Sequence, residues 1–279
     1  SGGGGLCLTN GADVQVNNSA LLELKNNTAT SYSGGGSYLD TGARLKVDGG
    51  GKLQILQNEA NTYGGALFLK DADTTLAVSG ADTHVIVQDN VAASGGGGLC
   101  LTNGADVQVN NSALLELKNN TATSYYGGGF YLSTGARLMV SGFGSRTTIQ
   151  GNTAGNSGGG MFMKTLAAVL VDGGGMLHIF ENEARRSHGG GIYLTSSATL
   201  SGSGNGTKLM VLNNTAGGEG GGFYGLNQTR VFVHNGASLF VRRNVAKLSG
   251  GGITLRGKTV LEVTTNAQVI IERNLCSEM

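Results

Sequence analysis

The sequence predicts an all-β fold, a parallel β-helix of nine coils with three short strands in each coil. Glycine-rich triplets recur at intervals of 30 to 32 residues along the 279-residue chain. Each interval holds three apolar segments that alternate with the period of two typical of a strand. We therefore expect one domain over residues 1–279. The coils are expected to start near Gly3, Gly34, Gly64, Gly96, Gly127, Gly158, Gly189, Gly220 and Gly250.

The three predicted strands follow one another in a fixed order within each coil. The first comes directly after the glycines, as in residues 6–8 (LCL) and 67–69 (LFL). The second is typified by residues 14–16 (VQV) and the third by residues 22–24 (LEL). Turn-forming stretches such as TNGA, DTGA and DGGGK separate the strands. A helix is not favoured, because no window carries a glycine-free apolar stripe at helical spacing.

An asparagine follows the third strand of every coil, in the pattern aliphatic-x-x-Asn. In stacked coils these side chains form one column, in which each amide hydrogen-bonds its own turn and the amides above and below. Asparagine also tolerates the left-handed backbone of a corner, and the glycines that follow allow close approach between coils. The predicted column consists of Asn27, Asn58, Asn90, Asn120, Asn152, Asn182, Asn214, Asn244 and Asn274.

The composition argues against electrostatic partners. Only 13% of the residues are charged and the net charge is +1, so no broad basic field is expected for nucleic acid or an anionic membrane. No apolar run approaches the 18 residues of a membrane span, so no membrane insertion by this chain is expected. The charge is uneven, with 7 basic and 11 acidic residues in 1–139 and 12 basic and 7 acidic residues in 140–279.

The pairing of Gly-Gly-x-aliphatic with aliphatic-x-x-Asn resembles the GGA[ILV] and FxxN repeats of the chlamydial polymorphic outer membrane proteins. Residues 64–67 read GGAL, whereas most triplets are Gly-Gly-Gly and the Phe of FxxN is Leu, Ile or Val. The resemblance covers all nine coils. It implies a right-handed β-helical rod at a cell surface, in that family an adhesin.

The sequence contains only weak motifs for nucleotide binding, catalysis or metal binding. Residues 252–259 (GITLRGKT) fit the phosphate-loop pattern, but a strand instead of a helix is expected after them, so nucleotide binding is not favoured. The outward positions of the second and third strands place no two carboxylates on neighbouring coils, as acid–base hydrolysis of polysaccharides would require. The four histidines fall in four different coils. We therefore assign no catalytic residue, metal or cofactor.

Two groups of residues are candidates for contacts or modification. The outward position of the first strand is aromatic in six coils, which predicts either rings covered by a loop or stacked on one another, or a lateral contact stripe for a neighbouring rod or sugar rings. This stripe consists of Tyr38, Phe68, Tyr131, Phe162, Tyr193 and Tyr224. N-glycosylation sequons occur at Asn17, Asn26, Asn110, Asn119, Asn205, Asn213 and Asn227.

The expected function is that of a non-enzymatic extracellular structural protein. The repeats run to both ends of the sequence without a recognisable cap, so other copies of the chain are the expected partners, stacked end to end into a filament. Residues 1–32 and 94–125 are identical, which fits growth by duplication. One alternative is a passenger segment of a cell-surface adhesin that contacts surface glycans or host receptors. A second is a carbohydrate-active β-helix enzyme.

Overall fold

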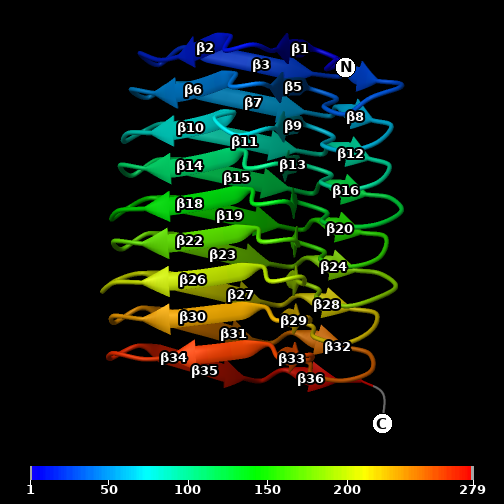
Figure 1. Ribbon diagram of the computed structural model, residues 1–279, viewed down its shortest axis with the longest axis vertical. Coiled ribbons are helices and arrows are strands. Elements are labelled where there is room, and N and C mark those ends of the chain that lie inside the picture. The colour runs from blue at the N-terminus through cyan, green and yellow to red at the C-terminus, as the bar shows by residue number, and fades with distance from the viewer. Residues whose placement is uncertain (1, 278–279) are drawn as a thin grey trace.

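The computed structural model describes residues 2–277, which form nine stacked coils built from strands alone (Figure 1). Residue 1 and residues 278–279, the limits of the predicted domain, lie outside the described residues. Each coil contributes one strand to each of four nine-stranded parallel sheets. The prediction of a parallel β-helix with nine coils is confirmed, but the number of strands per coil is four and not three.

The first two sheets contain the first and second strands of each coil. Sheet 1 consists of β1 (Leu6–Leu8), β5 (Ser37–Asp40), β9 (Leu67–Lys70), β13 (Leu99–Thr102), β17 (Phe130–Leu132), β21 (Met161–Met163), β25 (Ile192–Leu194), β29 (Phe223–Gly225) and β33 (Ile253–Leu255). Sheet 2 consists of β2 (Asp13–Val16), β6 (Arg44–Asp48), β10 (Thr75–Ser79), β14 (Asp106–Asn110), β18 (Arg137–Ser141), β22 (Ala168–Asp172), β26 (Thr199–Ser203), β30 (Arg230–His234) and β34 (Val260–Val263).

The other two sheets contain the third strands and the fourth strands, which have two residues each. Sheet 3 consists of β3 (Leu21–Lys25), β7 (Lys52–Leu56), β11 (His84–Gln88), β15 (Leu114–Lys118), β19 (Arg146–Gln150), β23 (Met176–Phe180), β27 (Lys208–Leu212), β31 (Ser238–Arg242) and β35 (Gln268–Glu272). Sheet 4 consists of β4 (Thr28–Ala29), β8 (Glu59–Ala60), β12 (Val91–Ala92), β16 (Thr121–Ala122), β20 (Thr153–Ala154), β24 (Glu183–Ala184), β28 (Thr215–Ala216), β32 (Val245–Ala246) and β36 (Leu275–Cys276).

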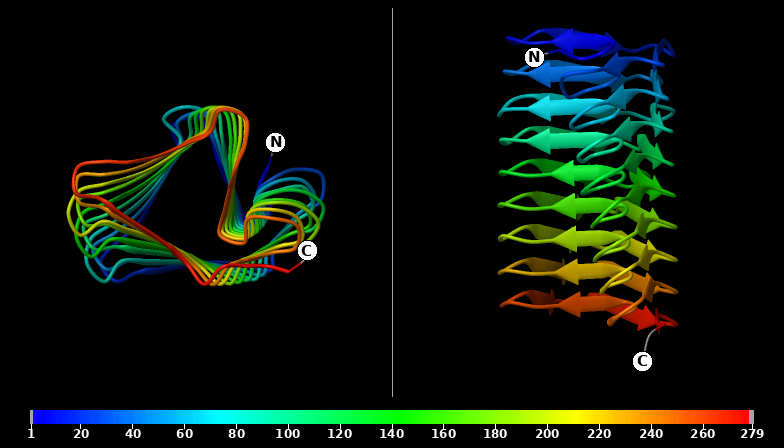
Figure 2. Two further views of the ribbon diagram at one scale, coloured as in Figure 1. Left: turned by 90° about the horizontal axis from the view of Figure 1, so that it is seen from below. Right: turned by 90° about the vertical axis from the view of Figure 1, so that its right-hand side faces the viewer.

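The register aligns equivalent residues of successive coils. In sheet 2, for example, Leu45 lies beside Leu76, and Leu76 lies beside Val107. Alternate side chains of sheets 1, 2 and 3 point inward and form one continuous apolar core along the axis. Viewed down that axis, the coils lie over one another, and each is rotated slightly from the one before it (Figure 2). Because every coil buries its apolar residues against the next, the outward positions are left to vary.

Candidate functional site

The predicted asparagines form a continuous hydrogen-bonded column. The Nδ2 group of Asn90 donates to Oδ1 of Asn120 at 2.9 Å, and the backbone N–H of Asn90 donates to the same oxygen at 3.0 Å. Nδ2 also donates to the carbonyls of Ile55 and Gln88, each at 2.9 Å. This arrangement recurs in successive coils, and the inner asparagines are almost completely buried. The two outermost members, Asn27 and Asn274, are partly exposed.

The left-handed residue of this corner is the one before the column asparagine. Asn119, Asn213 and Arg243, for example, have φ angles of 53°, 53° and 54°. The left-handed backbone that asparagine tolerates is therefore not adopted by the column asparagines themselves. The column position is reserved for an amide because that side chain supplies both donors and an acceptor along the axis.

The glycine triplets bring consecutive coils into backbone contact. A Cβ atom added to Gly128 would collide with the carbonyl oxygen of Gly159 and would lie 2.6 Å from the backbone carbon and nitrogen of Thr153. Neither neighbour is the free end of a flexible side chain, so a larger residue would force the coils apart. This close approach explains why the first two positions of the triplet are glycine in every coil, whereas the third position, where Ala66 occurs in one coil, admits a Cβ atom.

The predicted aromatic stripe is present but is covered. Tyr38, Phe68, Tyr131, Phe162 and Tyr224 are 4–9% exposed and Tyr193 is partly exposed. The loop between sheet 4 and the next glycine triplet folds over them, and Tyr126 from this loop stacks on Phe162 with 4.4 Å between ring centroids. Because the rings are covered, an open lateral contact stripe at these residues is corrected to a second hydrophobic core.

The covered rings also stack along the axis. Phe162 and Tyr193 are 5.0 Å apart between centroids with 7° between their planes, and Tyr193 and Tyr224 are 5.1 Å apart. Cys100 takes the place of a ring in its coil and is 1% exposed. Burial raises the pKa of the Tyr193 hydroxyl to about 12 and also raises the pKa of the Cys100 thiol. Both groups are therefore neutral at physiological pH.

Two of the histidines, His84 and His188, make separate polar contacts. Nε2 of His84 lies 2.8 Å from Oε2 of Glu116. Burial alone would raise the pKa of Glu116, but hydrogen bonds from Lys118 and His84 hold it below its usual value. Nδ1 of His188 accepts a hydrogen bond of 2.9 Å from the backbone N–H of Glu219. Within residues 2–277, no group of three His, Cys, Asp or Glu side chains is placed to hold a metal ion.

The phosphate-loop pattern lies in extended structure. Its middle residues form β33, and β34 begins at Val260, directly after Thr259. No helix occurs in the described part of the chain, so the helix N-terminus that binds phosphate in this motif has no counterpart there. Residues 2–277 likewise contain no helix long and apolar enough to cross a bilayer.

The sequons all lie on the outside of the coils. Asn26, Asn119, Asn205, Asn213 and Asn227 are exposed. The other two sequon residues, Asn17 and Asn110, are partly buried. Glycosylation at any of them stays a prediction.

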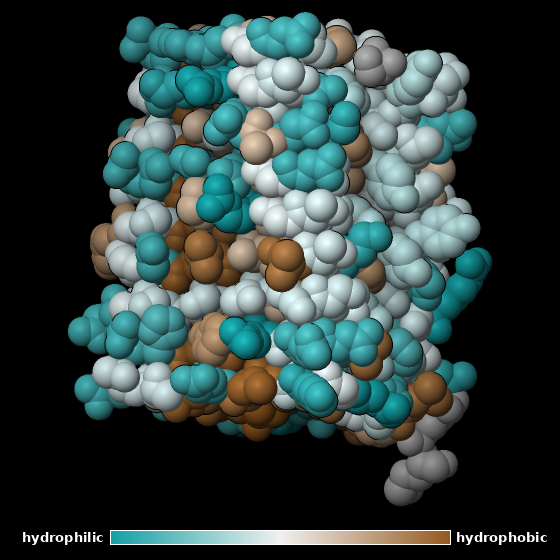
Figure 3. All heavy atoms as spheres, viewed as in Figure 1, coloured by the Kyte–Doolittle hydropathy of each residue, from teal (hydrophilic) through white to brown (hydrophobic). Residues whose placement is uncertain are grey.

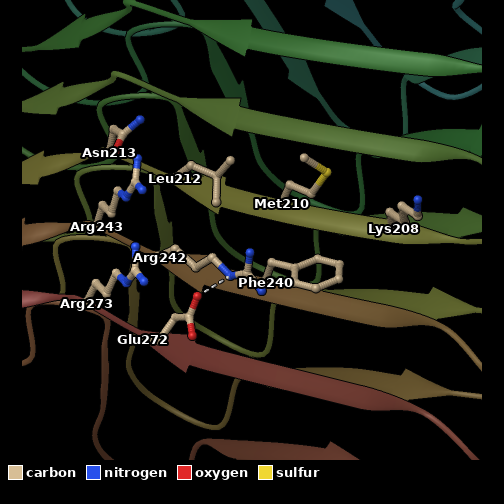
Figure 4. Close-up of a pocket in the computed structure, with 9 residues that line it drawn as sticks. All are labelled: Lys208, Met210, Leu212, Asn213, Phe240, Arg242, Arg243, Glu272 and Arg273. Carbon is tan, nitrogen blue, oxygen red and sulfur yellow. Dashed lines mark ion pairs between the residues drawn. The ribbon is translucent and has the colours of Figure 1, made fainter.

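A groove with a volume of about 570 Å³ lies on the outer face of sheet 3 (Figure 4). It crosses β27, β31 and β35 and is called the basic groove below. Its walls are formed by Lys208, Met210, Leu212, Asn213, Phe240, Arg242, Arg243, Glu272 and Arg273. Of these residues, only Asn213 is a candidate from the sequence, as a sequon. A signal was present in the sequence, since Arg243 and Arg273 precede Asn244 and Asn274 and therefore occupy equivalent repeat positions in adjacent coils.

Four parallel sheets, a buried amide column and stacked glycine corners define the chain as a parallel β-solenoid. The family model described as right-handed beta helix region matches residues 10–216, so the chain belongs to that family. A comparison with curated proteins gives no match. Among solved structures, the chain is similar to the TibC-catalysed hyper-glycosylated TibA55-350 fragment, at 15% identity and a TM-score of 0.21, over 95% of this chain and 99% of that one. At this TM-score the likeness carries no argument about function.

Proposed function

We propose that this protein is a non-enzymatic structural rod that stacks end to end with other copies of itself into a secreted or surface filament. One observation carries the proposal, namely that the same 32-residue sequence occurs as residues 1–32, in the first coil, and as residues 94–125, inside the rod. The contacts that residues 94–125 make with the preceding coil therefore indicate which contacts residues 1–32 can make with a coil of another copy.

The two copies differ in exposure because only one has a coil on each side. Leu115, Leu117 and Asn120 are 0% exposed. Their counterparts in the first coil are more exposed, since Leu22 and Asn27 are partly exposed and Leu24 is 8% exposed. Cys7 is likewise exposed, whereas Cys100, its counterpart, is buried. The outer edge of the first coil thus has the apolar and polar groups that bind a preceding coil elsewhere in the rod.

The last coil offers the complementary edge. Ile253, Leu261 and Val269 pack against the core but are only partly buried. Figure 3 shows hydrophobic atoms at this lower end of the molecule. A second copy in the same register places its first coil against these residues, which continues the apolar core across the junction.

The asparagine column gives the junction specific hydrogen bonds. Oδ1 of Asn27 accepts no hydrogen bond from a described residue, whereas Oδ1 of Asn274 accepts two from Asn244, at 2.9 and 3.0 Å. In a stacked pair, the backbone N–H and Nδ2 of Asn274 would donate to Oδ1 of Asn27 in the next copy. The acidic first half and basic second half favour the same polarity, through an attraction that salt screens.

The repeat motifs support a location outside the cell. The resemblance of residues 64–67 and the aliphatic-x-x-Asn pattern to chlamydial surface proteins favours a secreted or surface rod. The same resemblance favours, as a second candidate, a passenger segment that spaces the binding region of an adhesin from the membrane. Surface labelling of intact producing cells distinguishes both from an intracellular protein, which would stay unlabelled.

An engineered disulfide tests the stacking directly. Cys7 occupies the same sheet position as Thr254, so a Thr254→Cys variant would bring two thiols together on adjacent coils of different copies. Neighbouring parallel strands are ~4.8 Å apart, within the Cα separation of about 4.4–6.8 Å that a disulfide needs. Oxidation should therefore produce a covalent ladder of oligomers on a non-reducing gel.

Two controls make the result decisive. The double variant Thr254→Cys/Cys7→Ser keeps Cys276 and should yield no ladder above the background that this cysteine gives. Electron microscopy of the unmodified protein should reveal rods longer than the ~43 Å expected for nine coils at ~4.8 Å each. Single rods at every concentration, together with no covalent ladder, would refute end-to-end assembly.

A further inference from the structure

The basic groove combines unpaired cations with an apolar floor. Arg243 and Arg273 are exposed, lie in adjacent coils and project side by side at one end of the groove (Figure 4). Neither guanidinium forms an ion pair or hydrogen bond with a described residue. Because coils are ~4.8 Å apart, the two like charges repel each other when no anion lies between them.

Among the four cationic side chains of the groove, only Arg242 forms an ion pair with another groove residue. Nε of Arg242 lies 3.1 Å from Oε1 of Glu272, and the guanidinium lies 4.8 Å from the centre of the Phe240 ring. Lys208 stands at the opposite end of the groove, four residues before Leu212 on β27. The groove therefore carries an excess positive charge at both ends, whereas the whole chain has a net charge of only +1.

The floor between the charged ends is apolar and partly exposed. Met210, Leu212 and Phe240 occupy outward positions of β27 and β31, and Met210 lies beside Phe240 in the register. An aromatic ring with a neighbouring thioether can receive the apolar face of a sugar ring, while the charged ends hold anionic substituents.

We propose that the basic groove binds an acidic oligosaccharide, one whose sulfate or carboxylate groups are carried on consecutive sugar rings. Strand β27 covers ~13 Å from Lys208 to Leu212, and Arg243 and Arg273 lie beyond that end of the strand, so a single phosphate or sulfate ion cannot contact both ends. An extended polyanion can. Arg243 and Arg273 together hold one anionic group, and Lys208 holds another further along the chain.

A single-stranded nucleic acid fits the groove less well. Its recognition usually uses several aromatic side chains on which successive bases stack, and Phe240 is the one aromatic residue in the groove lining. The acidic oligosaccharide is therefore the ligand we propose, and binding of nucleic acid is treated as an outcome against it.

Calorimetric titration tests the proposal with defined probes. A heparin hexasaccharide supplies sulfate groups, an oligogalacturonate of similar length supplies carboxylates alone, and a dextran oligomer supplies neither. The protein is produced without N-glycosylation because the Asn213 sequon lies in the groove. We expect one of the two acidic probes to bind, the dextran to be silent, and affinity to fall with salt.

Matched variants separate a built site from general attraction. Arg243→Ser/Arg273→Ser should weaken binding by about tenfold or more, the effect of losing about 1.4 kcal/mol. Arg185→Ser/Arg186→Ser removes the same charge from two exposed arginines outside the groove and should change the affinity less than about twofold. Phe240→Ala should weaken binding while leaving the salt dependence unchanged.

Several results would overturn the proposal. Equal losses in the two double-arginine variants would assign binding to net charge and not to the groove. Tighter binding of an oligothymidylate, or no binding by either acidic oligosaccharide, would remove the ligand class. The groove lies on the lateral face, and the Thr254→Cys ladder is independent of this binding, so failure of one proposal is distinguishable from failure of the other.

Discussion

Replacing one amide of the asparagine column should cost far more inside the rod than at its edge. Asn120 and Asn27 lie in the identical sequences 94–125 and 1–32, so Asn→Ala has the same effect on the unfolded chain around each. They differ only in what surrounds them. This makes Asn120→Ala and Asn27→Ala a matched pair for measuring what stacking contributes.

The difference can be worked out from the hydrogen bonds. Oδ1 of Asn120 accepts from the backbone and side chain of Asn90 at 3.0 and 2.9 Å, and its Nδ2 donates to Val87 O and Asn152 Oδ1, each at 3.0 Å. Asn27 loses only the Nδ2 bond to Asn58 Oδ1, at 2.9 Å. At about 1 kcal/mol net for each bond, Asn120→Ala costs about 4 kcal/mol and Asn27→Ala about 1 kcal/mol.

Scanning calorimetry at concentrations where light scattering finds only monomers is the appropriate assay. A difference of about 3 kcal/mol corresponds to a Tm gap of roughly 6–12 °C for a domain of this size. The buried backbone N–H of Asn90 left without a partner contributes to that gap. Equal Tm values for the two variants would contradict the argument, because they would mean that the column is a consequence of the stacked coils and does not stabilise them.

Three further predictions concern single positions. Gly128→Ala should destabilise more than Gly135→Ala, measured by Tm, because the added Cβ meets backbone at Gly128, whereas at Gly135 nothing lies within 4 Å and only the φ of 73° opposes it; equal losses would contradict the role of close approach. Burial lowers the pKa of His188, so the folded state favours the neutral imidazole. The stability that this gives is fully present above the pKa of the unfolded chain, about 6.5, and is lost as pH falls through the lower pKa of the folded state. An NMR titration that places the pKa of His188 in the folded protein at or above about 6.5 would refute this. Cys7 should react with a thiol reagent in the native monomer while Cys100 reacts only after unfolding; the opposite order would mean that the first coil is covered.

The coil architecture could be predicted because the sequence repeats the same physical requirement nine times. The asparagine before each glycine triplet, and the aliphatic residue three positions before it, mark the corner in every coil. An inward column must keep one residue type, since each member bonds to the next. Such a constraint leaves a visible period in the sequence.

The fourth strand could not be predicted from the same pattern. Strands such as β4 (Thr28–Ala29) and β12 (Val91–Ala92) have two residues, too few for an alternation to be seen. Only their alanines are regularly buried, and alanine is common in many contexts. These strands exist because the corner asparagine aligns the chain with the coil above, as in the bond from Val91 N–H to Asn58 O at 2.9 Å.

The aromatic stripe was ambiguous for a related reason. A period of two assigns Tyr131 and Phe162 to the outside of sheet 1, and they do point away from the central core. Whether a loop covers them depends on the tertiary path of residues such as Tyr126, which no local pattern fixes. Alternation identifies the side of a strand and not the presence of a second layer beyond it.

Positions that keep one residue type in every coil indicate structure, whereas positions that vary between coils can indicate function. In the corner column the amide never changes, whereas the left-handed position directly before it changes from Asn119 in the fourth coil to Arg243 and Arg273 in the last two. Stacking fixes the inner position, because each asparagine bonds to the next coil. It leaves the outer position free, because that side chain meets solvent. Two arginines that occur in neighbouring coils, at a position where other coils have other residue types and despite their mutual repulsion, are therefore the kind of departure from which binding specificity can arise.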